Sequence, residues 1–203
     1  DFFAFSRNQE HNLNLIRRER GIFNFSLKFI NHPFKENNKK FTIEKNNFIK
    51  KNLCKLTLIG QPNKEIFIRD ILSWFNEDHN LKSYYKVKYK PHPRENNSIP
   101  KDLFLKNKNN IYSKSTPIQE VLKESHIIIL ISSSVGVEAV CSKTPVIVYH
   151  PPDIAEITSN EYIVLDGEFK NIFSNKKELI EILKKVNKNY IGFIEFFYKN
   201  SFE

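Results

Sequence analysis

The chain has 203 residues, enough for one domain with a substantial hydrophobic core, or for one domain and part of another. Its net charge is +9, but lysine and arginine are spread along the chain among acidic residues. A nucleic-acid-binding surface gathers such residues on one face, so nucleic acid is not an expected partner. A basic surface is compatible instead with anionic lipid or a phosphorylated substrate.

Two cysteines, Cys54 and Cys141, lie far apart and have no neighbours at the spacing of metal ligands. Neither a disulfide framework nor a zinc site is therefore predicted, and a reducing compartment is expected. No stretch approaches the ~18 apolar residues of a transmembrane helix, and the start lacks the pattern of a signal peptide. The chain begins at Asp1 and contains no methionine, as expected for a piece of a longer protein.

The composition changes near residue 50. Residues 1–50 hold scattered aromatic clusters and a polar stretch over 35–40, without a clear helix or strand period. We interpret this segment as a connector from a further domain, and residues 51–203 as the folded unit.

From residue 55 onward, apolar strands alternate with amphipathic helices. The first strand is predicted over 56–59, the second around 84–89 with one solvated side, and a fully buried one over 127–131. Further strands are expected over 145–149 and 163–165. The first helix shows apolar residues at i, i+4, i+7 and i+8, namely Phe67, Ile71, Trp74 and Phe75.

Three more helices complete the alternation. The sequence Thr116-Pro117-Ile118-Gln119 predicts a capping box followed by a helix that buries Ile118, Val121 and Leu122. A second helix is predicted over 135–141, and Asn175 with Glu178 predicts the cap of a last helix. Repeated βα units with short connections indicate an α/β protein with a Rossmann-like, doubly wound parallel sheet.

The most informative motif is Lys90-Pro91-His92-Pro93-Arg94, which follows the second strand. Prolines on both sides of His92 restrict the backbone and disfavour a helix, so a stiff loop at a strand end is predicted. In open α/β sheets ligands bind at these strand ends, where a histidine can give a hydrogen bond or a proton to a phosphate. A surface turn with an incidental histidine is the alternative.

A second motif, Ser132-Ser133-Ser134, joins the most buried strand to a helix. Backbone N–H groups and serine hydroxyls at a helix N-terminus favour an anion, and Gly136 permits close approach. One serine suffices for N-capping, which is the alternative role. Glu138, one turn inside the helix, can reach a ribose hydroxyl or compensate the helix dipole.

The first strand ends at Gly60-Gln61-Pro62-Asn63-Lys64-Glu65, which lacks the G-x-G-x-x-G fingerprint, and no Walker motif occurs anywhere. NAD and P-loop chemistry are therefore not expected, and a glycine here also suits an ordinary turn. This loop, the His92 loop and the serine turn are predicted at one sheet edge. His150 is a weaker candidate for the same edge, and His126 is interpreted as a structural polar residue.

The sequence from Leu58 to Glu65, together with Tyr89 to Arg94, resembles the bacterial lipooligosaccharide sialyltransferases, over roughly residues 55–150. A histidine–proline motif followed by serines also occurs in polysialyltransferases and capsule Kdo transferases. The resemblance implies a GT-B enzyme that transfers sialic acid, or a related acidic sugar, from a CMP-activated donor to a cell-surface glycan. It implies that this chain is the donor-binding half and that residues 1–50 are a remnant of the acceptor-side domain.

The resemblance also implies the roles of individual residues. His92 would assist the departing phosphate, and the donor would contact Gly60, Gln61, Pro62, Pro93, Arg94, Ser132, Ser133, Ser134 and Gly136. The family has an aspartate as base where this chain has Asn63, so Glu65 or a residue outside the chain would replace it.

The partners implied are a nucleotide-sugar donor and a glycan or glycolipid acceptor, with no metal and no other cofactor. A cytoplasmic location is expected. Peripheral association with the inner face of the cell membrane and a homodimer are left open. The alternatives are another GT-B enzyme, such as a Kdo or glycerol-phosphate transferase or a sugar-nucleotide epimerase, and a non-catalytic nucleotide-sugar-binding module.

Overall fold

The computed structural model describes residues 2–4, 27–29, 54–95, 110–152 and 167–202. A two-stranded parallel sheet pairs β1 with β2, and a separate sheet contains five strands. The strands are β1 (Phe2–Ala4), β2 (Leu27–Phe29), β3 (Cys54–Ile59), β4 (Tyr85–Lys90), β5 (Ile127–Leu130), β6 (Val146–Tyr149) and β7 (Ile172–Phe173). The helices are α3 (Glu65–Glu77), α4 (His79–Tyr84), α5 (Ile118–Glu124), α6 (Val135–Cys141), α7 (Lys176–Lys188) and α8 (Tyr190–Phe202), with a 3-10 turn η3 (Gly167–Phe169).

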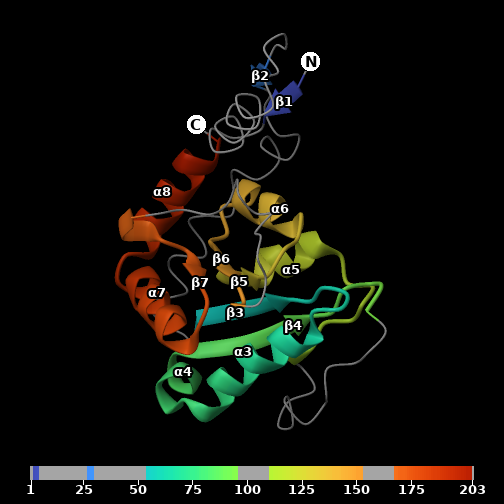
Figure 1. Cartoon of the computed structure of the whole chain (residues 1–203), viewed down its shortest axis with the longest axis vertical. Coiled ribbons are helices and arrows are strands. Elements are labelled where there is room, and N and C mark those ends of the chain that lie inside the picture. The colour runs from blue at the N-terminus through green and yellow to red at the C-terminus, as the bar shows by residue number, and fades with distance from the viewer. Residues whose placement is uncertain (1, 5–26, 30–53, 96–109, 153–166, 203) are drawn as a thin grey trace.

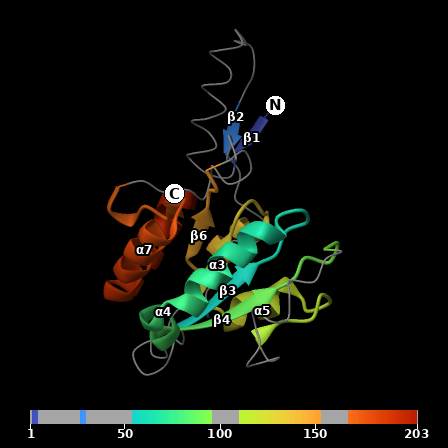
Figure 2. The same ribbon diagram turned by 60° about the horizontal axis from the view of Figure 1, so that its bottom comes forward.

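The five-stranded sheet is parallel throughout, with the order β4-β3-β5-β6-β7. Helices α3 and α4 lie on one side of it and α5 and α6 on the other, as Figures 1 and 2 show. This arrangement confirms the predicted α/β, Rossmann-like doubly wound sheet. The chain reverses its direction of progress between β3 and β5, and such a switch point opens a crevice at the strand C-termini.

Continuous apolar runs explain why β5 and β6 lie inside the sheet. Every residue of both strands is buried, because helices cover both faces of a parallel sheet. Strand β4 is an edge strand, and its alternation was predicted from Tyr85, Val87 and Tyr89. One expectation for its outer side is wrong, since Lys90 is buried at the end of the strand.

Helix α3 packs on the sheet along a stripe that differs from the predicted one. Its buried residues are Ile68, Ile71, Leu72 and Phe75. Phe67 and Trp74 lie at the border of this stripe, where both rings make edge contacts with Tyr149 of β6. The short helix α4 was not predicted; Asp78 caps it by accepting from the N–H groups of Asn80 and Leu81.

The predicted starts of α5 and α7 had different outcomes. Pro117 occupies the N-cap of α5 without a side-chain bond, so the Thr116 capping box is wrong. The burial of Val121 and Leu122 is confirmed. In α7, Asn175 accepts from the Glu178 N–H at 3.0 Å, as predicted.

The region after β6 holds elements that the sequence pattern did not reveal. Strand β7 is two residues long, and α8 follows α7, which was expected to be the last helix. The strand predicted over 163–165 lies outside the described residues.

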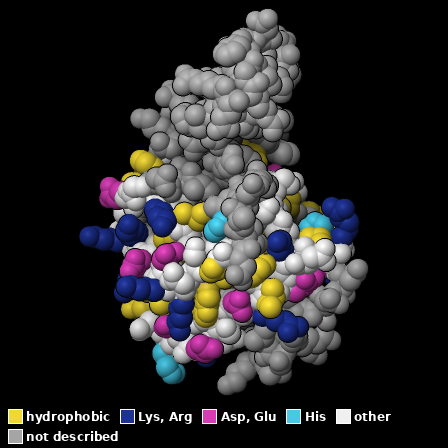
Figure 3. All heavy atoms as spheres, viewed as in Figure 1, with side chains coloured by type: hydrophobic (Ala, Val, Ile, Leu, Met, Phe, Trp, Pro, Cys, Tyr) yellow, Lys and Arg dark blue, Asp and Glu magenta, His cyan; other side chains and the backbone are white. Residues whose placement is uncertain are grey.

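Among the described residues, no helix combines the length and the apolar character needed to cross a membrane. Both cysteines are buried thiols, and burial raises the pKa of Cys54 to about 12. On the face shown in Figure 3, basic and acidic side chains are interspersed over the described residues.

Candidate functional site

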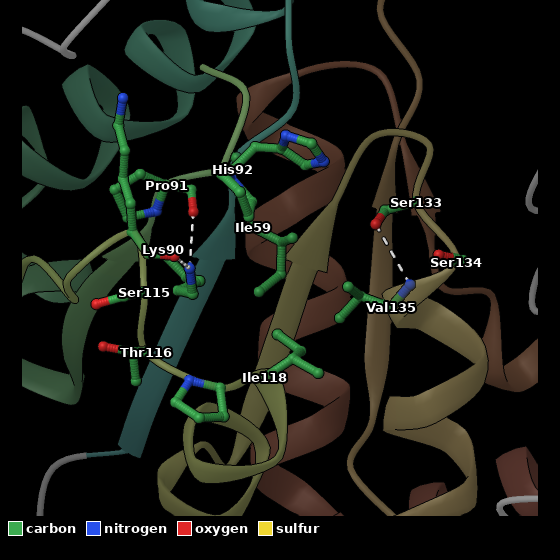
Figure 4. Close-up of a pocket in the computed structure, with 14 residues that line it drawn as sticks. Ile59, Lys90, Pro91, His92, Ser115, Thr116, Ile118, Ser133, Ser134 and Val135 are labelled. Atoms are coloured by element: carbon green, nitrogen blue, oxygen red, sulfur yellow. Dashed lines mark hydrogen bonds between the residues drawn. The ribbon is translucent and has the colours of Figure 1, made fainter. Parts of the chain in front are cut away.

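A cavity of about 480 Å³ opens at the C-terminal ends of β3 and β4 and beside the turn that follows β5 (Figure 4). Its walls come from four separate segments of the sequence. The lining residues are Ile59, Gly60, Lys90, Pro91, His92, Pro93, Lys114, Ser115, Thr116, Pro117, Ile118, Ser133, Ser134 and Val135. Ile59, Ile118 and Val135 give it an apolar part, and none of the lining residues is acidic.

Gly60 permits the close approach of β3 and the His92 loop. Its N–H donates to the carbonyl of Lys90 at 2.8 Å. A Cβ at this position would lie 2.4 Å from Tyr89 Oη, 2.7 Å from Glu95 Oε2 and 3.0 Å from His92 N. Only glycine therefore fits here without displacing neighbouring groups.

The His92 loop is a tight, fully bonded turn, as the flanking prolines predicted. The N–H of Glu95 donates to the His92 carbonyl at 3.1 Å, and the His92 N–H donates to Glu95 Oε2 at 2.9 Å. The N–H of Arg94 donates to His92 Nδ1 at 3.0 Å. Because Nδ1 accepts, the neutral imidazole carries its proton on Nε2 and can donate from that atom to a ligand.

The charge of His92 follows from its surroundings. Burial is the largest cause that lowers its pKa, followed by the Arg94 guanidinium, and Lys90 also lowers it. The Glu95 carboxylate acts in the opposite direction. A pKa below the ordinary value leaves the ring neutral at pH 7, and an anion bound beside Nε2 would raise that pKa.

Two lysines of the cavity were not among the predicted site residues. Lys90 Nζ donates to the carbonyls of Pro91 at 2.8 Å and Lys114 at 3.0 Å, while burial lowers its pKa. Lys114 Nζ donates to the Glu95 carbonyl. These bonds join the His92 loop to the segment before α5, which no local sequence pattern could reveal.

The three serines of the turn differ in their contacts. Ser133 Oγ accepts from the Val135 N–H at 3.3 Å, whereas the N-cap residue of α6 is Ser134, whose side chain makes no cap hydrogen bond. Ser134 is exposed at the cavity. Ser132 instead donates its N–H to Gln61 Oε1 at 2.9 Å, which ties the turn to the loop after β3.

The loop after β3 contains Asn63 in a left-handed conformation, with φ 62°. The Lys64 N–H donates to the Gln61 carbonyl at 3.2 Å and closes a four-residue turn, with Pro62 second and Asn63 third. This is the pattern of a type II turn, whose third position accepts glycine or asparagine. The turn thus gives Asn63 a structural reason to be there.

The predicted site residues divide into two groups. Gly60, His92, Pro93, Ser133 and Ser134 line the cavity. The cavity lining does not include Gln61, Pro62, Asn63, Glu65, Arg94, Ser132 or Gly136. Gly136 is buried in α6, and Glu65 is the first residue of α3.

Other candidates of the sequence have partners of their own. Burial raises the pKa of Glu138, whose Oε2 accepts from Gln119 at 3.1 Å. His126 is the satisfied polar residue that was expected, since its Nδ1 accepts from the Lys55 N–H. Over the described ranges, no group of three or more His, Cys, Asp or Glu residues is arranged to hold a metal ion.

No family model and no curated protein matches this sequence. Several solved structures share its fold. The chain aligns over 98% of its length with TarM, with a TM-score of 0.50, 15% identity and 39% of TarM covered. It also aligns over 98% of its length with WaaG, a glycosyltransferase involved in lipopolysaccharide biosynthesis. The TM-score is 0.54, the identity is 10%, and 57% of WaaG is covered. The alignment with the wall teichoic acid polymerase TagF, in a structure with CDPG, again covers 98% of this chain. The TM-score is 0.53, the identity is 16%, and 52% of TagF is covered.

These similarities show the fold of GT-B glycosyltransferases. The chain spans between 39% and 57% of the length of these three proteins. The family of lipooligosaccharide sialyltransferases stays a prediction from the sequence motifs.

Replacing Gly60 with alanine should destabilise the protein and disturb the His92 loop, because the new methyl group would overlap Tyr89 Oη and Glu95 Oε2. Overpacking of this kind costs about 1–3 kcal/mol. Urea unfolding would measure the loss. Gly192→Ala is the matched control, since the new methyl group meets only the exposed Asn189 side chain there, and the cost is limited to the hydrogen bond that Asn189 Oδ1 accepts from the Gly192 N–H. Equal stability of the two variants would contradict the packing argument.

Replacing Arg94 with glutamine should raise the pKa of His92, because the guanidinium charge is removed while the backbone N–H bond to Nδ1 stays. An NMR titration of labelled histidine would follow the ring. Lys177→Gln on α7 is the control for a lost exposed charge and should leave the pKa unchanged. An unchanged or lower His92 pKa in Arg94→Gln would show that the Arg94 charge does not act on the ring.

Proposed function

We propose that this chain is the nucleotide-sugar-binding half of a GT-B glycosyltransferase whose donor is a CMP-activated acidic sugar, such as CMP-sialic acid. The observation that carries the proposal is the cavity at the switch point. Its polar lining residues are basic or hydroxylic, with Lys90, Lys114 and His92 as the basic ones, and part of the lining is apolar. Such a lining suits an anionic ligand that also has an apolar surface.

The phosphate of the donor is assigned to the space between His92 and the serine turn. Figure 4 shows the imidazole reaching from its loop toward the side of the cavity where Ser133 and Ser134 lie. The Nε2–H and the Ser134 hydroxyl are donors on two sides of this space, while Lys90 and Lys114 contribute positive charge. Hydrogen bonds to an ionised phosphate are stronger than neutral ones.

In the proposed reaction, the bond between the anomeric carbon of the sugar and the phosphate oxygen breaks. The departing CMP keeps the electron pair, and an acceptor hydroxyl forms the new bond to the anomeric carbon. His92 stabilises the phosphate by donating from Nε2, and a base removes the hydroxyl proton of the acceptor. In this proposal, the His92 Nε2–H and the Ser134 hydroxyl face the phosphate on which charge develops, as electrostatic stabilisation requires.

The identity of the base is a separate proposal. Asn63 has no basic site, and its turn explains an asparagine at this position. Glu65 is the nearest acidic residue along the chain and begins α3, so it is the candidate within this chain. A residue of the acceptor side is the other source.

Other donors fit the same fold. A Kdo or glycerol-phosphate transferase, or a sugar-nucleotide epimerase, would place a different nucleotide in the same cavity. A non-catalytic module would bind the nucleotide without turnover. A panel of CMP, CDP, UDP and GDP in a thermal-shift assay separates the donor classes, because the tightest ligand gives the largest stabilisation. We further propose a glycan or glycolipid acceptor and action at the cytoplasmic face of the membrane.

CMP should bind saturably to the full chain below about 1 mM, and His92→Ala should weaken binding about tenfold or more. This is the loss expected when one hydrogen bond to a charged group is removed. His92→Gln should keep part of the affinity, since its amide nitrogen reaches the position of Nε2. Calorimetry gives the affinities, and His79→Ala at the start of α4 is the control. Absence of saturable binding, or equal binding by His92→Ala, would refute the proposal.

Asn63→Asp and Glu65→Gln should differ in transfer activity of the full-length protein, with little effect on CMP affinity. If Glu65 is the base, its replacement lowers transfer by ~10²–10⁴-fold, the usual worth of general-base catalysis. If a missing aspartate limits the rate, Asn63→Asp raises transfer instead. Donor turnover with acceptor present measures both. Two variants with wild-type rates would place the base outside this loop.

A further inference from the structure

We propose that Glu95 is the positioning residue of this site, and that its buried carboxylate fixes the loop that presents the His92 imidazole to the cavity. This inference rests on the proposed function, because it names the group that prepares His92 for the donor phosphate. Glu95 itself is not part of the cavity lining.

The first observation is that one residue satisfies both backbone polar groups of His92. Glu95 Oε2 accepts from the His92 N–H at 2.9 Å, and the Glu95 N–H donates to the His92 carbonyl at 3.1 Å. The backbone of His92 therefore cannot rotate without breaking a bond to Glu95. The ring is held as well, through the Arg94 N–H on Nδ1.

The second observation is that the carboxylate is tied to the sheet. Glu95 Oε1 accepts from Tyr89 Oη at 2.5 Å, and both residues are only 2% exposed. Tyr89 belongs to β4, and the missing side chain of Gly60 leaves the space in which its hydroxyl and the carboxylate meet. The position of His92 is thus fixed by contacts with β4 and with Gly60 after β3, and not by the loop alone.

The third observation concerns charge. Burying a carboxylate is costly unless it is well bonded, and here the two oxygens bond two different partners, Tyr89 Oη and the His92 N–H. The carboxylate is not part of the cavity lining, although it acts electrostatically on the lining residues His92 and Lys90. A carboxylate in the cavity lining would repel a phosphate. Glu95 instead holds the His92 backbone from outside the lining.

Two variants of Glu95 distinguish the effect of its side-chain length, which lets it bond both partners, from the effect of its negative charge. In Glu95→Gln the amide oxygen can accept from the His92 N–H while the amide nitrogen donates to Tyr89 Oη, because a tyrosine hydroxyl both donates and accepts. Glu95→Asp keeps the charge but is one methylene too short to span both partners. Positioning predicts that Glu95→Gln resembles the wild type and Glu95→Asp does not. An electrostatic role predicts the reverse.

Two measurements on the full chain test the proposal. The ¹⁵N shifts of the His92 ring report the tautomer, and calorimetry reports the affinity for CMP. We expect Glu95→Gln to keep the Nε2–H signature and an affinity within about threefold of wild type. Glu95→Asp should show averaged ring signals and about tenfold weaker binding, the loss for one misaligned bond to a charged group.

The outcomes distinguish this inference from the proposed function. If the wild type fails to bind CMP, the ring signals still decide, and averaging in Glu95→Asp alone supports the positioning role. Wild-type ring signals and affinity in Glu95→Asp overturn it, as do equal losses in both variants. Should Glu95→Asp not fold, Tyr89→Phe replaces it, since this change removes only the bond to β4. Unaltered ring signals in Tyr89→Phe then overturn the proposal.

Discussion

The burial of the parallel strands on both faces is the constraint from which the rest of this structure follows. With helices on either side of β5 and β6, neither face of the central sheet can carry a polar site. Polar groups can gather only where the strands end, and the crossover from β4 over β3 to β5 opens a crevice at that edge. The loop of His92 and the serine turn meet there because topology leaves them no other place.

The site is built so that its charges have separate positions. Basic side chains line the cavity, whereas the Glu95 carboxylate lies outside the lining and accepts hydrogen bonds from Tyr89 and His92. Lys90 has two roles, because its ammonium donates to two backbone carbonyls and the residue also lines the cavity. A histidine kept neutral in this setting can serve as a donor whose affinity for a proton grows once an anion arrives.

Sequence reasoning succeeded where a local pattern has a single structural meaning. The apolar run of β5 allows no alternative to a buried strand, and the Asn175 cap defines the start of α7. The prolines around His92 likewise indicate a turn, and the structure has His92 in such a turn at the cavity. Within the serine motif, the pattern could not tell that Ser133 and Ser134 line the cavity while Ser132 bonds Gln61.

The remainder depends on contacts between distant segments. In the sequence, Lys90 resembles the solvated lysines of β4. In the structure it is buried, and its ammonium donates to the carbonyl of Lys114, which lies 24 residues on. In the sequence, Glu95 is one of several polar residues in a row. Only the structure shows that its carboxylate is buried in the space beside Gly60. The wrong capping box at Thr116 has the same origin, since Pro117 takes the N-cap and Gln119 is drawn to Glu138 on the neighbouring helix.

The bonds around Lys114 also affect how this protein can change over time. The Lys114 side chain holds the Glu95 carbonyl, and the Tyr112 N–H donates to the Tyr89 carbonyl at 2.9 Å. The two described segments that border the cavity are therefore bonded directly to each other, although Lys114 lies 19 positions beyond Glu95. A substitution of Lys114 consequently affects the His92 loop as well, so these two segments cannot change independently of each other.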